Sequence, residues 1–449
     1  MAVRVSQTLK VLRNKRGNPM KKPFLERIAG REIQVFVVFT IFLFWLTAFL
    51  TDTPMNILEG MVKIVSSRDA LITDYFELGG YGAAFFNAGF VLMMGYLLLV
   101  AEKATFTGLT MAALFMNAGF AFFGKNPLNV WPILLGTFLY AKFHHTRLNR
   151  YIYTALFGTC LAPFITEIIY ILPYSKWVNM AVSVMVGILI GFLLPPLSMH
   201  TASMHMGYNL FNVGFSAGIV AFVMVCVLRS FGMEPEPALI WTYGTPVPLL
   251  IACYGYFLLA FMYGLILSKG QWKGWIKIMR HPGRAVADFV YMDGVGATFL
   301  NMGLVGMLAT TFILVIGGDL SGPVVGAILT VFGFGAFGVH LRNYSPVLLG
   351  VFLTTLVNTF NIRTPSIQLA AVFSMGVAPI AGQFGPVAGL LAGFLHVAIV
   401  SCTNDMYGGL NLYNNGFSCG WVAIVMVPFV ESFYKRFDTY KRSKGGSKK

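Results

Sequence analysis

Long apolar stretches alternate with short polar ones along almost the whole chain. Most of them run for 15 to 22 residues with few or no charges, which is close to the length that a bilayer-spanning α-helix needs. Several are short enough to be half-helices or strongly tilted spans. The pattern predicts an all-α polytopic membrane protein with 12–14 spans. The apolar segments lie near residues 33–51, 83–101, 106–123, 127–143, 151–172, 177–195 and 211–229, and again near 248–267, 297–316, 321–338, 345–360, 367–383, 385–400 and 416–430.

The chain carries an internal repeat. When the sequence is shifted by 214 residues, "DYFELGGYGAAFFNAGF" from Asp74 aligns without a gap with "DFVYMDGVGATFLNMGL" from Asp288. Later the shift becomes 202, and "GYNLFNVGFSAG" from Gly207 aligns with "GLNLYNNGFSCG" from Gly409. Chance similarity in a glycine-rich chain explains this poorly, because shared Asn and Pro residues keep their order over most of both halves. Repeats of this size in a membrane protein are typical of transporters.

The charges predict how the two repeats are oriented. Residues 1–32 carry nine basic and two acidic residues, and the tail 431–449 is also basic. Cytoplasmic flanks of spans are rich in Lys and Arg, so we expect both termini in the cytoplasm. Seven crossings by a first repeat, 33–229, then leave the linker 230–247 outside, and this linker has no basic residue. The second repeat, 248–430, is therefore predicted to be inverted relative to the first.

Composition excludes several classes of protein. The chain is 57% hydrophobic and 11% charged, with a mean hydropathy of +0.72, whereas soluble domains carry about 25% charged residues. The net charge of +15 is concentrated at the two ends, which favours contact with membrane lipid over nucleic acid. The five cysteines show no paired spacing, so we expect neither a disulfide framework nor a metal site, and no cofactor. The stretches around Lys63 and Lys277 are either interfacial helices or basic loops.

Two kinds of polar segment interrupt the apolar pattern, and each occurs once in each repeat. They are the Gly-rich starts of the second apolar segments and the stretches 198–214 and 401–416 before the seventh. Non-helical backbone at membrane depth survives only where protein or water surrounds it, and such breaks form the binding site in transporters with inverted repeats. We expect these amides either to bind a small polar solute or ion, or to hold helices together by hydrogen bonds. The candidate solute ligands are Asn87, Asn209, Asn212, Asn301, Asn411 and Asn414. We expect the stretches 198–214 and 401–416 to meet at one wet cavity near the midplane.

Three titratable residues in these stretches are candidates for handling a proton or coupling ion. Asp405 stands where the first repeat has Ser203, and a carboxylate at membrane depth is usually functional. An exposed loop acid is the alternative. His200 and His205 lie in "MHTASMHMGY", where they are proton-handling groups or helix-packing residues. Metal binding by these histidines and their methionine neighbours is the less favoured interpretation.

The motifs of several enzyme classes are absent. The sequence has no GxxxxGK[ST], no HExxH and no GxSxG, so we expect neither an ATPase nor a hydrolase of those types. The alternatives to transport are an intramembrane enzyme acting on a lipid or lipid-linked group, and a structural or sensory membrane protein. A homo-oligomer is left open.

One motif carries a family resemblance. The pattern N-x-G…[ST]-G…G-x4-G-x4-N-x2-P-x3-G occurs from Asn87 to Gly136 and again from Asn301 to Gly350. It resembles that of a family of bacterial polytopic membrane proteins with a domain of unknown function. The seven-plus-seven layout is similar to that of nucleobase and sulfate/bicarbonate carriers, and more loosely to that of the five-plus-five urea channels. The leading hypothesis is a secondary transporter or facilitative channel in the plasma membrane.

Overall fold

The computed structural model describes residues 22–70, 72–236, 239–403 and 405–445, and these ranges are helical, with no β-strand. The predicted all-α fold is therefore confirmed. The first half contains α2 (Lys22–Thr51), α3 (Pro54–Ser66), α4 (Tyr75–Ala101), α5 (Gly108–Phe120), α6 (Pro127–Phe143), α7 (Ile152–Gly158), α8 (Pro163–Ile171), α9 (Lys176–Met204) and α10 (Asn212–Ser230). The second half contains α11 (Val247–Leu267), α12 (Lys273–Ile278), α13 (Phe289–Asp293), α14 (Val295–Val315), α15 (Gly322–Phe334), α16 (Leu341–Val357), α17 (Pro365–Phe373), α18 (Ala378–Phe384), α19 (Pro386–Thr403) and α20 (Asn414–Gly445).

Ten helical segments of the described chain are long and apolar enough to cross a bilayer. Two of them are broken by 3₁₀ turns, η2 (Thr159–Leu161) between α7 and α8 and η3 (Ser374–Val377) between α17 and α18. The helices α5, α15 and α16 are apolar but shorter, and α6 has 17 residues. Every apolar segment expected from the sequence thus has a helix.

The outer helices expose more large apolar side chains than the surface of a water-soluble protein does. On α2, Phe42 is 60% exposed and Leu50 is 77% exposed, and on α11 Ile266 is 71% exposed. An apolar surface of this extent marks contact with a nonpolar phase. The central helices α5 and α15 are by contrast buried along their whole length. The structure is therefore that of a multi-pass membrane protein.

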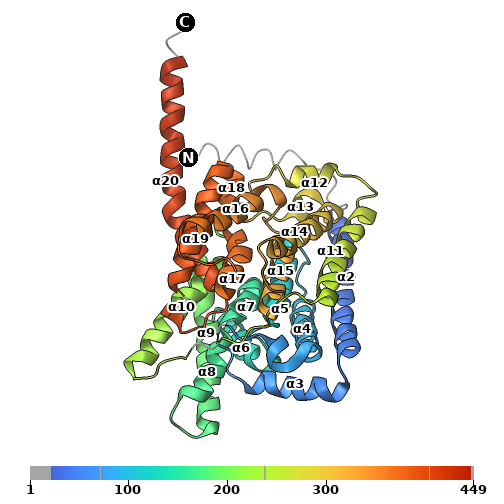
Figure 1. Cartoon of the computed structure of the whole chain (residues 1–449), viewed down its shortest axis with the longest axis vertical. Coiled ribbons are helices and arrows are strands. Elements are labelled where there is room, and N and C mark those ends of the chain that lie inside the picture. Colours follow the sequence, from blue (N-terminus) through green and yellow to red (C-terminus); the bar gives the residue numbers. More distant parts are fainter. Residues whose placement is uncertain (1–21, 71, 237–238, 404, 446–449) are drawn as a thin grey trace.

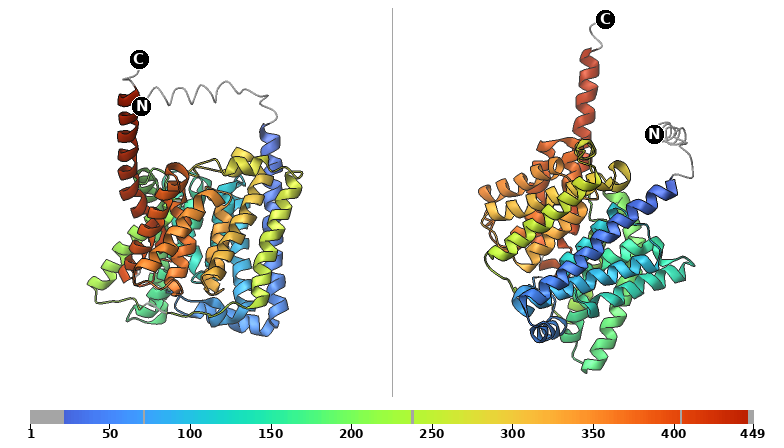
Figure 2. Two further views of the ribbon diagram at one scale, coloured as in Figure 1. Left: turned by 45° about the horizontal axis from the view of Figure 1, so that its top comes forward. Right: turned by 90° about the vertical axis from the view of Figure 1, so that its right-hand side faces the viewer.

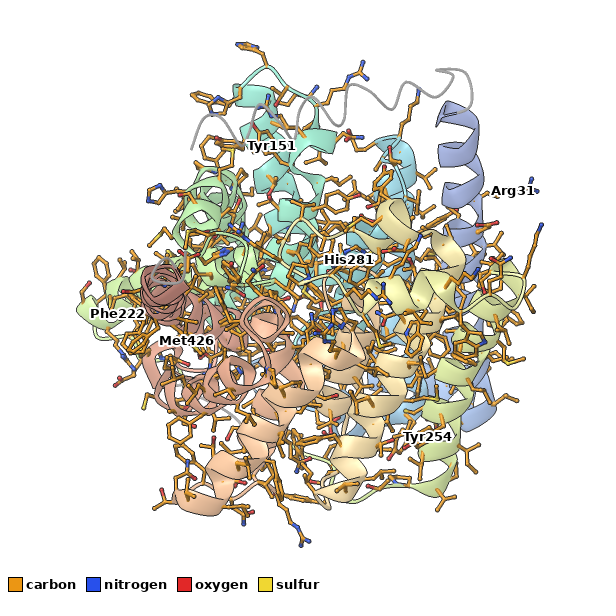
Figure 3. The ribbon with its side chains drawn as sticks, turned by 90° about the horizontal axis from the view of Figure 1, so that it is seen from above. Arg31, Tyr151, Phe222, Tyr254, His281 and Met426 are labelled. Carbon is orange, nitrogen blue, oxygen red and sulfur yellow. The ribbon has the colours of Figure 1, made fainter. Side chains whose placement is uncertain are left out.

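The two halves of the chain lie side by side (Figure 2, right). Seen from above, Arg31 of α2 and Tyr254 of α11 lie along one edge, and Phe222 of α10 and Met426 of α20 lie at the opposite edge (Figure 3). The start of α2 and the end of α20 lie at the same end of the molecule, the upper end in Figure 1. Helix α3 and the segment that joins α10 to α11 lie at the lower end.

The helices α5 and α15, each 13 residues long, pack against one another in the centre. Their closest approach is at Gly119 and Gly326, where a Cβ on either glycine would overlap the carbonyl oxygen of the other. Small residues let membrane helices approach closely, so that dispersion forces act over the whole contact. This contact joins the two halves.

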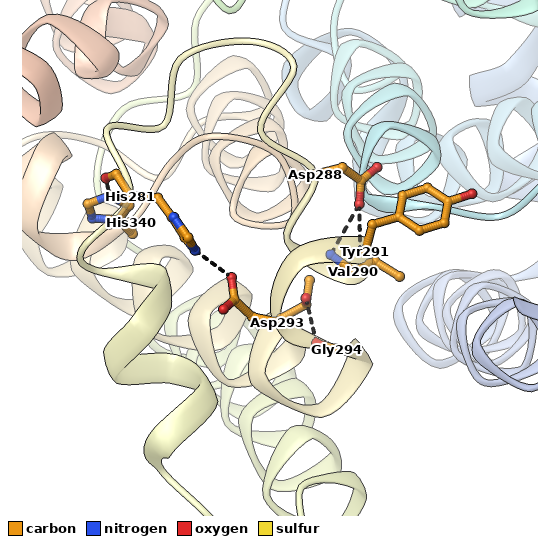
Figure 4. A network of polar contacts seen from close by, with 8 residues as sticks. His281, Asp288, Val290, Tyr291, Asp293, Gly294 and His340 are labelled. Carbon is orange, nitrogen blue, oxygen red and sulfur yellow. Dashed lines mark hydrogen bonds and ion pairs between the residues drawn. The ribbon is translucent and has the colours of Figure 1, made fainter. Parts of the chain in front are cut away.

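Two aspartates cap helices across the boundary between the halves. Asp74 accepts hydrogen bonds from the backbone N–H of Gly322, the first residue of α15, at 3.1 Å. Asp288 accepts from the N–H of Gly108, the first residue of α5, at 3.0 Å. Asp288 also caps its own helix α13 through the N–H groups of Val290 and Tyr291 (Figure 4). Each carboxylate therefore serves a helix N-terminus of the other half, where the macrodipole favours negative charge.

The stretches around Lys63 and Lys277 form helices, α3 and α12. Both precede a sharp change of direction at a glycine in the left-handed region, Gly80 at φ +85° inside α4 and Gly294 at φ +92° between α13 and α14. Glycine adopts this conformation without the strain that a Cβ would cause. Both basic stretches are thus helical, and their position in the membrane interface stays a prediction.

Candidate functional site

The two polar stretches predicted to form the site lie in loops between long helices. One loop joins α9 to α10, and the other joins α19 to α20 and contains η4 (Asp405–Tyr407). The N–H of Leu210 donates to the carbonyl of Gly376 in η3 at 2.9 Å, and the N–H of Leu412 donates to the carbonyl of Cys160 in η2 at 3.2 Å. Each loop thus contacts the helix break of the opposite half, and the two irregular segments satisfy one another's backbone groups as a bilayer requires.

Asn209 and Asn411 hold the turns that lead into α10 and α20. Each is buried, and each Oδ1 accepts the backbone N–H two residues further on, from Phe211 and Tyr413. The Nδ2 of Asn209 donates to the carbonyl of Gly416 at 3.0 Å, across the boundary between the halves. The Nδ2 of Asn411 is buried without a hydrogen-bond partner in the described chain. The role of these two amides as solute ligands stays a prediction.

Asn212 begins α10 and accepts two hydrogen bonds at Oδ1, from Thr201 at 2.9 Å and from His205 Nε2 at 2.9 Å. The N–H of Gly207 donates to Nδ1 of the same histidine, so Nδ1 is an acceptor and Nε2 carries the proton. His205 is therefore neutral in this arrangement and orients Asn212. Asn414 begins α20 and accepts from the hydroxyl of Thr403 at 2.6 Å.

Asn87 and Asn301 lie away from these loops. The Nδ2 of Asn87 donates to the carbonyls of Ala121 and Lys125, just beyond the end of α5, at 2.7 and 2.8 Å. The Nδ2 of Asn301 makes the equivalent bonds to two carbonyls beyond the end of α15, both at 2.7 Å. Both side chains are fully buried, and their Oδ1 atoms have no partner in the described chain. The geometry gives them a helix-terminating role, and solute binding by them stays a prediction.

Aromatic rings fill the place where the two loops meet. The ring centroids of Phe211 and Tyr413 are 4.7 Å apart, and each ring is 1% exposed. Phe120 at the end of α5 contacts Tyr413, and Phe334 at the end of α15 contacts Phe211, with centroid distances of 5.3 and 5.1 Å. We call Phe120, Phe211, Phe334 and Tyr413 the aromatic partition. Aromatic packing of this kind is dry and well ordered.

Two cavities lie on either side of this partition. The upper cavity, of about 390 Å³, is lined by the loop before α10 and by Ala285, in the segment between α12 and α13 at the upper end of Figure 1. The lower cavity, of about 380 Å³, is lined by residues 359–361, by the start of α20 and by Ile72, between α3 and α4 at the lower end. Asn209 and Asn212 line the upper cavity and Asn414 lines the lower one. The single shared cavity expected from the sequence is thus replaced by two, because the aromatic partition occupies the centre.

The comparisons identify the family. The model of the family DUF1576, described as a protein of unknown function, matches residues 53–230 and 267–432. The chain belongs to the DUF1576 family. The two matched segments begin 214 residues apart, which is the shift found in the sequence. No curated protein and no solved structure matches the chain.

One titratable candidate of this DUF1576 member, His200, lies apart from the centre. His200 is exposed on α9, where its carbonyl accepts the hydroxyl of Ser203. Asp405 belongs to η4, but its side chain lies outside the part of the chain that the structure describes. Proton or ion coupling by either residue stays a prediction.

Lys125 is a buried cation that the sequence analysis did not single out. Its Nζ donates to Asn117 Oδ1 at 3.0 Å and lies 5.0 Å from the centre of the Phe120 ring. The side chain is fully buried, and no carboxylate among the described residues forms an ion pair with it. The repeat places Val339 at the equivalent position, so this charge is not part of the repeated framework. The sequence held a signal, because Lys125 is the sole charged residue between residues 104 and 141, and buried charges in membrane helices are usually functional.

Proposed function

We propose that the protein is a secondary transporter or facilitative channel for a small polar solute or ion, built from two inverted repeats. Paired contacts between the halves support a two-fold relation, and the equivalent helices α3 and α12 lie at opposite ends of the molecule, as inversion requires (Figure 1). The Asp74–Gly322 and Asp288–Gly108 hydrogen bonds exchange under the 214-residue shift, as two-fold symmetric contacts must. The loop contacts are paired in the same way. Leu210 and Leu412 are equivalent positions of the two repeats, and so are their partners in the helix breaks, Gly376 and Cys160.

One observation carries the transport proposal. Two consecutive residues face different cavities, since Tyr413 lines the upper cavity and Asn414 lines the lower one. The two cavities therefore approach one another at the start of α20, beside the ring of Tyr413, and a rearrangement of the aromatic partition is the proposed step that joins them. Alternating access of this kind, around a fixed central site with broken helices, is how inverted-repeat transporters work.

The proposal includes an orientation and a set of partners. With both termini in the cytoplasm, as the basic ends predict, the upper cavity opens toward the cytoplasm and the lower cavity toward the outside. Bilayer lipid covers the apolar outer helices, and one small solute is the transported partner. A homo-oligomer remains open.

Flux into proteoliposomes tests the proposal. The purified protein is reconstituted and assayed with radiolabelled or fluorescent reporters for neutral polyols, urea, small anions and monovalent cations. Phe211→Ala removes one ring of the partition and is expected to raise the flux of the same solute that the unmodified protein moves. Phe429→Ala is the matched control, because Phe429 is 63% exposed on α20 and does not belong to the partition. If neither the unmodified protein nor Phe211→Ala moves any solute of the panel, the proposal is overturned.

A cluster on α19 and α20 is the specific observation that favours the enzyme alternative. Cys419 Sγ lies 3.5 Å from His396 Nδ1, and His396 Nε2 lies 3.1 Å from Asn415 Oδ1. Thiol hydrolases use a cysteine, a histidine and an asparagine in this order. Here, however, Asn415 lines the lower cavity and Cys419 is fully buried behind the histidine. A nucleophile must touch its substrate, so the direction of this cluster supports a role in orienting Asn415 instead.

A further inference from the structure

The lower cavity is lined by three asparagines whose side-chain oxygens are already occupied. Asn415 is 6% exposed, and its Oδ1 accepts from His396 Nε2 at 3.1 Å. Because an amide oxygen can only accept, His396 donates from Nε2, and the Sγ of Cys419 lies 3.5 Å from the other ring nitrogen, Nδ1. Because the Oδ1 of Asn415 is occupied by His396, the Nδ2 of Asn415 is the group available to the cavity.

Asn414 and Asn361 follow the same arrangement. The Oδ1 of Asn414, a residue that is 4% exposed, accepts from the hydroxyl of Thr403, and the Oδ1 of Asn361 accepts from the N–H of Arg363 at 2.9 Å. Within the described ranges, the Nδ2 groups of Asn361, Asn414 and Asn415 make no hydrogen bond to the protein. Three amides thus present N–H donors to one cavity.

The amides of the upper cavity differ in this respect. There the Nδ2 of Asn212 donates to the carbonyl of Ser198 at 2.8 Å, and the Nδ2 of Asn209 donates to the carbonyl of Gly416. Each upper amide thus gives one of its two N–H donors to the protein itself. The three lower amides give none to the described residues, so the donor surplus is larger at the lower cavity.

The backbone around the lower cavity adds positive potential. Helix α17 begins at Pro365, between the lining residues Thr364 and Ser366, and α20 begins at Asn414. Both helix N-termini thus lie at the cavity wall, where the macrodipole favours an anion. None of the described residues that line the cavity is acidic. Asp319 accepts a hydrogen bond from the side chain of Gln368. Its oxygens also accept from the N–H of Gly244 and the indole of Trp241.

We propose that the lower cavity binds a small oxyanion, such as a carboxylate or sulfate, through the Nδ2 groups of Asn361, Asn414 and Asn415. Oxyanions only accept hydrogen bonds, which suits a wall of donors with occupied acceptors. A neutral polyol or urea would also bring O–H or N–H groups, for which the oxygens of the three amides are already occupied and hydroxyls such as those of Ser366 and Ser401 are the side-chain acceptors of the lining. A cation would face three amide N–H groups and two positive helix ends. This inference names the substrate class of the proposed transporter and rests on that proposal for its biological meaning.

Equilibrium binding to the purified full-length protein tests the site without requiring transport. Isothermal titration with sodium acetate and with sodium sulfate is compared with titration by urea and by glycerol. Asn415→Asp places a negative charge on the wall and is expected to weaken oxyanion binding about tenfold or more, because like charges repel strongly at such short range. Asn56→Asp is the matched control, since Asn56 is exposed on α3 and lies outside the cavity lining.

Asn361→Asp provides a second variant that is safe for folding, because Asn361 is exposed at the rim of the cavity. Loss of acetate or sulfate binding in both cavity variants, with binding kept in Asn56→Asp, supports the inference. Equal binding in all variants, or binding of urea or glycerol in place of the oxyanions, overturns it. The two failures are distinguishable: oxyanion binding without flux contradicts the transport proposal alone, and flux of a neutral solute without oxyanion binding contradicts this inference alone.

Discussion

The contact between α5 and α15 gives a sharp test of the structure through Gly119→Ala. A Cβ on Gly119 would lie 3.0 Å from the carbonyl carbon of Gly326 and closer still to its oxygen. Ordinary contacts between such atoms begin near 3.4 Å, so the two helices must separate by roughly 1 Å. The obstacle is backbone, which cannot rotate away as a side chain can.

Overpacking of this kind costs about 1–3 kcal/mol, and a backbone obstacle in the centre of the molecule belongs near the upper end. Replacing a helical glycine by alanine returns about 1 kcal/mol of helix propensity. The expected net loss is therefore about 2 kcal/mol in the free energy of unfolding. In detergent this should lower the apparent Tm by a few degrees, as measured by fluorescence-detected size-exclusion chromatography after heating.

Gly255→Ala is the matched control. Gly255 lies inside α11, and nothing lies within 4 Å of a Cβ built there, so this variant should keep or slightly raise the Tm. The double variant Gly119→Ala and Gly326→Ala should lose less than the sum of the two single losses, because one separation of the helices relieves both overlaps. If Gly119→Ala is as stable as Gly255→Ala, the close packing of the two short helices is refuted.

Four further predictions follow from the caps, the charges and the orientation. Asp288→Ala removes the cap of α5 together with that of α13 and should cost about 2–4 kcal/mol in unfolding free energy; an unchanged Tm would show that these bonds are not formed. Burial raises the pKa of Asp69, in the segment between α3 and α4, to about 7 from 3.8, so its stabilising contribution is complete below pH 3.8 and is lost as the pH rises to 7; Asp69→Asn should flatten the fall in Tm between pH 4 and pH 7, and a parallel fall would contradict this. Single cysteines at Glu234 and at Lys444 should react differently with an impermeant thiol reagent outside intact cells, and labelling at Lys444 would overturn the orientation. Asp405→Asn should abolish pH- or ion-dependent flux while leaving insertion intact, and unchanged coupling would remove Asp405 from the mechanism.

Much of the fold follows from the sequence because membrane insertion is a local property. A helix that must satisfy its own backbone in lipid is recognisable from its own 15 to 22 residues. The short segments near 106–123 and 321–338 accordingly became the short helices α5 and α15. The glycines at 80 and 294, repeated in register, likewise mark the two sharp changes of direction.

The roles of individual polar residues were less accessible. Asn87 and Asn209 belong to the same polar class in the sequence, yet one holds the turn beyond α5 and the other joins the two halves. Lys125 carries a signal in its isolation, but its burial beside Phe120 depends on how the turn after α5 folds back. The difference between these roles depends on partner atoms that sequence spacing does not place.

The sequence by itself determined that this is an all-α, multi-pass membrane protein and where its apolar helical segments lie. Hydropathy, charge and glycine positions are enough for this, because each acts over one segment at a time. Only the tertiary structure decided that the loops of opposite halves contact one another, that an aromatic partition divides two cavities, and which amide groups remain available in each. Leu210 and Gly376, like Leu412 and Cys160, are far apart in the chain. Whether an amide is spent or available depends on the close approach of such distant segments, which a local pattern cannot specify.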